Sequence, residues 1–141
     1  MSLRKNEIER YSRQIILKDI GINGQKKLKK SKVLIIGLGG LGCPAAEYLS
    51  RAGVGTIGLI DHDRVSLSNI HRQSIFTASD IKKYKIDVVK QRIKKVNPHV
   101  NIKSFKKKIE DFNIKKIIKS FDIVIDGTDN FSSKFLINKF S

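Results

Sequence analysis

The sequence has little cysteine and no long apolar segment, and both shortages exclude classes of protein. Cys43 is the only cysteine among 141 residues, so the chain cannot form an internal disulfide bond or a zinc site built from cysteines. No apolar run is long enough to cross a bilayer. The first residues, MSLRKNEIERYSRQ, also contain no apolar stretch of the kind found in a secretory signal. These features predict a cytoplasmic protein with no membrane partner.

Acidic residues are scarce as well, and nucleic acid is the first partner that this suggests. The chain has 13 Asp and Glu residues against 29 Lys and Arg, which gives a formal net charge of +16. However, only 7 of the basic residues are Arg, the side chain that most often recognises bases and phosphates. The basic segments also lack the alternating aromatic residues that would stack bases. We therefore expect no nucleic-acid partner, although a basic surface would attract an acidic protein.

Short apolar runs alternate with amphipathic segments along the chain. Residues 33–36 form a β-branched run bounded by glycine, which is typical of a buried strand. Further strands are predicted at 56–60, 101–105 and 121–125. Helices are predicted at 5–30, with a break at 21–24, and at 41–52, 80–96, 114–120 and 130–141. This alternation predicts an α/β, Rossmann-like fold, a mostly parallel sheet with flanking helices at 32–141, preceded by a helical element at 1–31.

The turn after the first predicted strand is rich in glycine. It contains Gly37-x-Gly39-x-x-Gly42, and the second strand ends at Asp61. In this strand–turn–helix setting the glycines allow a tight turn and close approach of backbone to phosphate, while the acidic residue accepts hydrogen bonds from ribose. The pattern predicts a nucleotide site. It suits both an NAD(P) or flavin oxidoreductase and an ATP-binding enzyme, so it does not choose between them.

Polar residues in the segment DHDRVSLSNIHRQSIF favour ATP. Asn69, Arg72 and Gln73 follow directly after the predicted ribose site, where a dehydrogenase needs no cationic cluster. A triphosphate does need one, because a guanidinium group offers a planar fork to phosphate oxygens. Lys85, at the start of a predicted helix, could add a point charge.

Two carboxylates follow the fourth predicted strand. Asp126 and Asp129 lie beyond its carboxyl end, the edge of an open α/β sheet at which ligands bind. Mg²⁺ is commonly held by a carboxylate together with phosphate oxygens of the substrate. We therefore expect Mg²⁺ alongside ATP, held by a carboxylate of this pair.

At these residues the sequence closely resembles the ThiF/MoeB/HesA family, relatives of the ubiquitin-activating enzymes. The combination of the glycine loop with D-x-D-x-V-x-x-S-N-x-x-R-Q is specific, and the similar stretches cover almost all of the chain from residue 10 onward. These stretches are RYSRQIIL (10–17), VLIIGLGGLGCPAAEYLSRAGVG (33–55), LIDHDRVSLSNIHRQ (59–73), VNPHV (96–100) and DIVIDGTDNFSSKFLIN (122–138).

The resemblance implies a nucleotidyltransferase. Such enzymes use ATP to activate the C-terminal carboxylate of a ubiquitin-like sulfur-carrier protein that ends in Gly-Gly. The acyl-adenylate is later converted to a thiocarboxylate for molybdopterin or thiamine biosynthesis. Catalysis consists mainly of positioning and charge neutralisation, since the carboxylate is already a nucleophile.

The resemblance also assigns roles to residues. Catalytic roles fall on Arg72 and Lys85, which would offset the charge of the departing pyrophosphate, and on Arg13, which would reach the ATP of a neighbouring subunit and so implies a homodimer. Asp129 would hold Mg²⁺. The nucleotide would be bound by Gly37, Gly39, Gly40, Gly42, Asp61, Asn69, Arg72, Gln73, Lys85 and Asp129.

The chain departs from the family pattern in two ways. Family members usually carry glycine and proline shortly before the phosphate-binding lysine, whereas this chain has Lys82-Lys83-Tyr84-Lys85. The family domain also continues well beyond position 141, with zinc-binding cysteine pairs that this chain lacks. We therefore expect the ATP-binding half of a truncated ThiF-type domain. A non-catalytic fragment that binds nucleotide or carrier is the alternative function.

Overall fold

A parallel four-stranded sheet forms the centre of the computed structural model, which describes residues 1–109, 114–129 and 131–140. The strand order is β3-β2-β1-β4, and all three neighbouring pairs are parallel. The predicted α/β, Rossmann-like fold with a parallel sheet is thus confirmed. The strands are β1 (Lys32–Ile36), β2 (Thr56–Ile60), β3 (Asn101–Phe105) and β4 (Ile123–Asp126).

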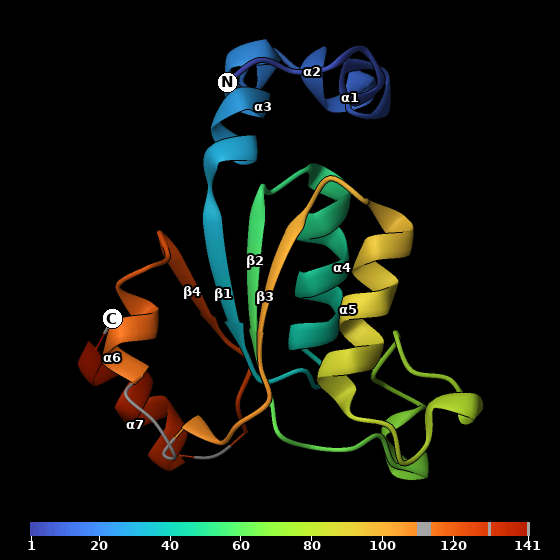
Figure 1. Ribbon diagram of the computed structural model, residues 1–141, viewed down its shortest axis with the longest axis vertical. Coiled ribbons are helices and arrows are strands. Elements are labelled where there is room, and N and C mark those ends of the chain that lie inside the picture. The colour runs from blue at the N-terminus through green and yellow to red at the C-terminus, as the bar shows by residue number, and fades with distance from the viewer. Residues whose placement is uncertain (110–113, 130, 141) are drawn as a thin grey trace.

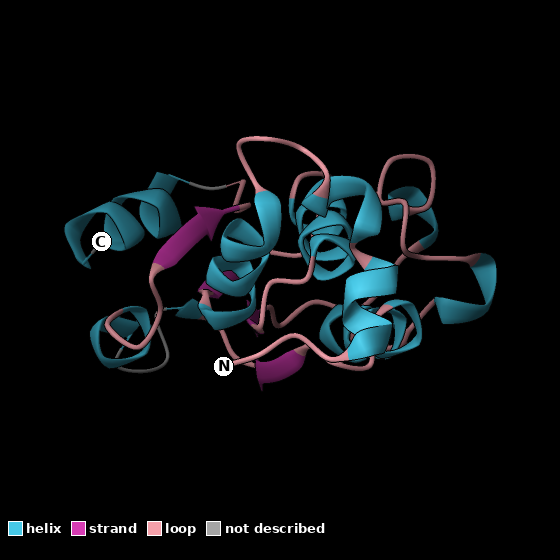
Figure 2. Ribbon diagram, turned by 90° about the horizontal axis from the view of Figure 1, so that it is seen from above, coloured by secondary structure: helices cyan, strands magenta, loops and turns pink. Residues whose placement is uncertain are grey.

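Helices cover both faces of this sheet (Figures 1 and 2). One face packs against α4 (Gly42–Ala52) and α5 (Lys85–Val96), and the other against α6 (Ile114–Ile118) and α7 (Phe131–Phe140). Successive side chains of a strand point to opposite faces, so β1 contributes to both apolar clusters. This explains why its sequence is apolar from residue 33 to residue 36. No described helix is long and apolar enough to cross a membrane.

Three short helices precede the sheet and lie beyond the end at which its strands begin (Figure 1). A buried network ties them to the sheet layer: the Asn97 side-chain amide donates to Tyr11 Oη and to the Ser50 carbonyl, both at 2.7 Å. The loops that follow the strands lie at the opposite end, which leaves that edge open for a ligand site. The three helices are α1 (Lys5–Arg10), α2 (Ser12–Ile15) and α3 (Gly21–Lys30).

The boundaries of several predicted elements were wrong. The break in the N-terminal helices falls at 16–20, and the segment 21–24 begins α3, because Gly21 adopts φ +56° at the start of that helix. The helix predicted from residue 80 begins five residues later, since Lys82 has φ +74°, which is outside the helical region. The strand predicted at 121–125 runs from 123 to 126.

An ion pair between a buried glutamate and a partly exposed lysine joins α1 to α3. Glu7 is 2% exposed, and Lys29 Nζ lies 2.6 Å from Glu7 Oε2. Burial raises the pKa of this carboxyl group, but hydrogen bonds from the Lys29 ammonium and the Arg4 backbone outweigh it and lower the pKa overall. A lowered folded-state pKa means that the carboxylate stabilises the fold above its unfolded pKa and loses that effect as pH falls through the folded value.

We expect Glu7→Gln to lower the free energy of unfolding by about 1–3 kcal/mol at neutral pH, because the partly buried Lys29 ammonium loses its charged partner. Denaturant unfolding at neutral pH and at about pH 3 would measure this, and the difference from wild type should shrink at the lower pH. Glu9→Gln, on the same helix but exposed, is the matched control. Equal destabilisation by the two variants would contradict the role of the pair.

Candidate functional site

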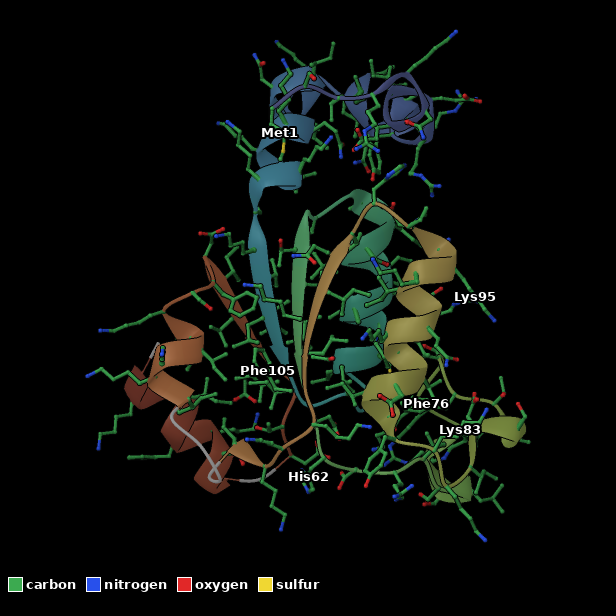
Figure 3. The ribbon with its side chains drawn as sticks, viewed as in Figure 1. Met1, His62, Phe76, Lys83, Lys95 and Phe105 are labelled. Atoms are coloured by element: carbon green, nitrogen blue, oxygen red, sulfur yellow. The ribbon has the colours of Figure 1, made fainter. Side chains whose placement is uncertain are left out.

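A cavity of about 370 Å³ opens at the carboxyl edge of the sheet. Figure 3 shows this edge, where His62 follows β2 and Phe105 ends β3. A cavity of this size is typical of small-molecule sites. Its walls come from residues 36–39, 60–63, 107–109 and 127–129, together with Gln73, Lys85 and Ser133.

Two glycines of the loop after β1 are required by the fold itself. Gly37 has φ +86°, and a Cβ there would lie 2.8 Å from the Gly127 carbonyl oxygen. A Cβ on Gly42 would lie 1.9 Å from the Gly37 carbonyl oxygen. These positions therefore bring β1, α4 and the loop after β4 close together, as the sequence pattern predicts for the turn and for close helix packing.

The other two glycines of the loop are not required by packing. A Cβ on Gly39 would be 3.6 Å from Gln73 Nε2, an ordinary contact, and one on Gly40 would have no atom within 4 Å. Both precede α4, whose free N–H groups and positive dipole end suit an anion. The space beside Gly39 and Gly40 therefore remains available for a ligand.

Asp61 joins the two loops that flank the cavity. Its Oδ2 accepts a hydrogen bond from the Leu38 amide and its Oδ1 one from the Asp63 amide, each at 2.7 Å. A carboxylate oxygen has two lone pairs, so both oxygens can still accept hydrogen bonds from ribose hydroxyls. The carboxylate is thus fixed in place by backbone donors before any ligand arrives.

Lys85 and Gln73 bring buried polar atoms to the cavity. Lys85 is 6% exposed, and its ammonium has its nearest carboxylate oxygen, Asp63 Oδ2, at 4.0 Å. Gln73 is 3% exposed, and its Oε1 has no hydrogen-bond partner among the described residues. Buried polar atoms are costly unless they are paired. A phosphate beside Lys85 and a hydrogen-bond donor beside Gln73 would satisfy both, so these residues fit a nucleotide.

The two carboxylates after β4 have different surroundings. Asp126 Oδ1 accepts from the Thr128 amide at 2.9 Å, and its Oδ2 lies 3.5 Å from Lys134 Nζ. Asp126 therefore caps the turn. Asp129 is exposed on the cavity wall, and no contact of its carboxylate with another described residue is found. A carboxylate in that position fits a metal ion shared with phosphate oxygens.

Three of the predicted site residues with polar side chains lie outside the cavity walls. Asn69 Oδ1 accepts hydrogen bonds from the amide and hydroxyl groups of Ser66, both at 3.0 Å, and so caps a 3₁₀ turn. Arg72 Nη1 donates to the Ser68 carbonyl at 2.9 Å. Arg13 is exposed on α2, which lies with the N-terminal helices at the opposite end of the sheet (Figure 1).

The structure therefore groups some of the predicted residues and separates others. The cavity walls include Gly37, Gly39, Asp61, Gln73, Lys85 and Asp129, but not Gly40, Gly42, Asn69, Arg72 or Arg13.

Sequence reasoning missed several residues of the walls. Lys107 and Lys108 follow β3, His62 and Asp63 follow β2, and Thr128 follows β4. The signal was available, since ligands of open α/β sheets bind outside the carboxyl ends of the strands. That rule was applied to the first, second and fourth strands but not to the third.

Cys43 lies on α4 but faces the core. It is fully buried, and its Sγ lies 3.4 Å from the Leu38 carbonyl oxygen, to which it donates. Burial raises the pKa of its thiol to about 12, so the thiolate is scarce at neutral pH.

We expect iodoacetamide at about pH 8 to leave Cys43 unmodified in the folded protein and to alkylate it fully in denaturant. Rapid alkylation of the native protein, measured by mass spectrometry, would contradict this.

The model of the ThiF family matches residues 11–141. Among curated proteins, the chain is 45% identical over 136 residues to "Adenylyltransferase and sulfurtransferase MOCS3" of Aedes aegypti, covering 96% of this chain and 31% of that protein. It is 44% identical to a "Probable molybdopterin-synthase adenylyltransferase" of Gracilaria tenuistipitata, covering 98% and 39%. It is 39% identical to the "Sulfur carrier protein adenylyltransferase" of Thermus thermophilus, covering 98% and 51%. The chain therefore spans between about a third and a half of these relatives.

Solved structures with a similar fold include proteins in complex with ATP. The Escherichia coli tRNA N6-threonylcarbamoyladenosine dehydratase TcdA, in complex with ATP, superposes with a TM-score of 0.86 at 26% identity, covering 92% of this chain and 53% of that one. Escherichia coli MccB with ATP gives a TM-score of 0.74 at 31% identity, covering 86% and 38%. Both crystals contain ATP on a fold of this type.

Proposed function

Because this chain belongs to the ThiF family, we propose that it binds ATP with Mg²⁺ and adenylates the C-terminal carboxylate of a ubiquitin-like sulfur-carrier protein. The observation that carries the proposal is the presence of two buried polar residues, Lys85 and Gln73, on one cavity, where Gln73 Oε1 has no hydrogen-bond partner among the described residues. Such a pair is costly in an empty site and is satisfied by an anionic ligand that also donates hydrogen bonds. Relatives named as adenylyltransferases support the same reaction.

ATP would be held by groups from several loops. Asp61 would accept hydrogen bonds from the ribose hydroxyls, and the loop containing Gly39 and Gly40 would leave room for backbone contact with the nucleotide. Lys85 would pair with phosphate oxygens. Mg²⁺, held by Asp129 and phosphate, would shield negative charge during the reaction. The described residues fit this ligand, since each of these groups lacks a close partner or has spare hydrogen-bonding capacity.

In the reaction, an oxygen of the carrier carboxylate forms a bond to the α-phosphorus of ATP. The bond from that phosphorus to the bridging oxygen of the β-phosphate breaks, and pyrophosphate leaves with the electron pair. No proton has to move, so the task of the site is alignment and charge compensation. Lys85 would supply part of the positive charge. Arg72 would supply more once its guanidinium group releases the Ser68 carbonyl and turns toward the phosphates.

A homodimer is part of the proposal. Arg13 lies at the end of the sheet opposite its own cavity, so it could reach only the nucleotide of a second subunit. Ile16 and Leu17 are exposed beside it, 72% and 53% respectively, and provide apolar area for a subunit contact. The carrier would end in Gly-Gly and serve molybdopterin biosynthesis, as one relative's name suggests, with thiamine biosynthesis as the alternative pathway. We also propose a cytoplasmic location, because a single cysteine suits a reducing compartment.

A second candidate function is nucleotide or carrier binding without turnover. This candidate is favoured because the chain matches only 31% and 51% of the length of two relatives, and residues outside the matched region can take part in their activity. An ATP–pyrophosphate exchange assay, with Mg²⁺ and a carrier ending in Gly-Gly, tests the two against each other. Exchange that disappears when the carrier lacks its last two glycines would establish adenylation. ATP binding without exchange would establish the second candidate instead.

A further inference from the structure

Tyr84, the residue directly before Lys85, has two cations against its aromatic ring. Arg64 Cζ lies 3.8 Å and Lys106 Nζ 4.1 Å from the ring centroid. Arg64 comes from the loop after β2, Tyr84 precedes α5, and Lys106 follows β3. Cations over an aromatic ring are attracted to its electron-rich face. The ring therefore joins three segments that surround the cavity.

Hydrogen bonds reinforce one side of this contact. Arg64 Nη1 donates to the Lys82 carbonyl at 2.8 Å, and the Val65 amide donates to the Lys83 carbonyl at 2.8 Å. Lys82 is held in the left-handed region at φ +74°, a conformation that a residue with a side chain adopts only when its surroundings impose it. The turn before Lys85 is thus shaped by its contacts with the loop after β2.

Lys106 reinforces the other side. Besides the ring of Tyr84, its ammonium contacts Asp87 Oδ2, in the first turn of α5, at 2.7 Å. The next two residues, Lys107 and Lys108, form part of the cavity wall. A single cation therefore fixes the loop after β3 to the start of the helix that carries Lys85.

We infer that Tyr84 is a positioning residue, which sets the places of Lys85 and of the loop 106–108 at the cavity and thereby raises its affinity for nucleotide. Tyr84 is not part of the cavity wall, so its effect passes through its neighbours. The inference rests on the proposed function in one respect, namely that ATP is the ligand. The loss of this contact would leave both lysine-bearing segments with more freedom, and part of the binding free energy would be spent on ordering them.

Three variants test separately the contributions of the Tyr84 ring, the Tyr84 hydroxyl group and the Lys106 charge. Tyr84→Phe keeps the ring, and Tyr84→Leu removes it. Lys106→Gln removes one of the two cations. Because the Lys106 side chain is 41% exposed, the Lys106→Gln variant folds even if Tyr84→Leu does not. Lys103→Gln is the matched control, because it removes the same charge from an exposed position on β3.

Calorimetric titration with ATP and Mg²⁺ gives the first readout. Tyr84→Leu should bind about 5- to 20-fold more weakly than wild type and Lys106→Gln about 3- to 10-fold, with Tyr84→Phe and Lys103→Gln within about 2-fold. The double variant Tyr84→Leu/Lys106→Gln should bind more tightly than the product of the two single effects predicts, because both changes remove the contact between the ring and Lys106. Unchanged binding by Tyr84→Leu, or equal weakening by Tyr84→Phe, would overturn the inference.

Amide hydrogen exchange of the ligand-free protein, followed by NMR, gives a second readout that needs no nucleotide. The Lys85 amide donates to the Asp63 carbonyl and the Lys107 amide to the Phe105 carbonyl, each at 3.0 Å. Both should exchange about 5-fold faster or more in Tyr84→Leu, while core amides of β1 keep their rates. If wild type bound no ATP, the proposed function would fail, and exchange alone would decide the inference. Unchanged rates at both amides would overturn it.

Discussion

Lys85→Met is expected to weaken the binding of ATP with Mg²⁺ by about 10- to 100-fold, the usual cost of losing a charged hydrogen-bond donor. The ammonium is almost fully buried on the cavity wall, and its nearest carboxylate oxygen is 4.0 Å away. Its free energy of burial is therefore poorly offset within the protein. A phosphate group would offset it far better, so most of the loss should appear in nucleotide affinity.

The same change should leave the fold intact. Methionine is apolar and of similar length, and replacing a weakly paired buried charge with an apolar group is often neutral or stabilising. Lys83→Met is the matched control, because Lys83 lies two residues away, is exposed and pairs with Asp80 instead. Calorimetry and thermal unfolding of both variants measure the two effects. Wild-type affinity in Lys85→Met would remove this lysine from the nucleotide site.

Gly42→Ala is expected to lower the free energy of unfolding by about 3 kcal/mol or more. The new Cβ would lie 1.9 Å from the Gly37 carbonyl oxygen, a backbone atom that cannot rotate away. Relief requires the start of α4 to move away from the turn after β1, which disrupts their close packing. A domain whose stability is marginal would then be largely unfolded at ordinary temperature.

Gly40→Ala is the matched control for that experiment. It lies two residues earlier in the same loop, and its added Cβ would meet no atom within 4 Å. Its φ is not positive, so the change should alter the free energy of unfolding by less than about 1 kcal/mol. Denaturant unfolding distinguishes the two variants. Equal stability would contradict the assignment of Gly42 to packing.

Buried strands were the most predictable part of the fold. Residues 33–36 and 57–60 carry no polar side chain because both faces of these strands are covered, and this leaves a clear pattern in the sequence. Helix starts were less predictable. The start of α5 depends on the left-handed conformation of Lys82, which tertiary contacts impose on a residue that rarely adopts it.

The residues of the candidate site also differ in how well the sequence predicts their positions. Asp61 lies on the cavity wall because it directly follows a strand that local sequence specifies, and Lys85 lies there at the start of α5. Asn69 and Arg72 were expected at the cavity, yet their side chains bond to Ser66 and Ser68, partners that polar spacing alone does not reveal. The distance of Arg13 from the cavity depends on how the N-terminal helices dock, which is a long-range property.

The most direct test of the central claim is an equilibrium titration of the wild-type chain with ATP and Mg²⁺, repeated in the presence of NADH. We expect saturable binding of one ATP per chain, weakened about 10- to 100-fold in Lys85→Met and not displaced by NADH. No ATP binding, or displacement of ATP by NADH with an affinity that depends on Asp61, would contradict it. The second result would return the glycine loop to oxidoreductase chemistry.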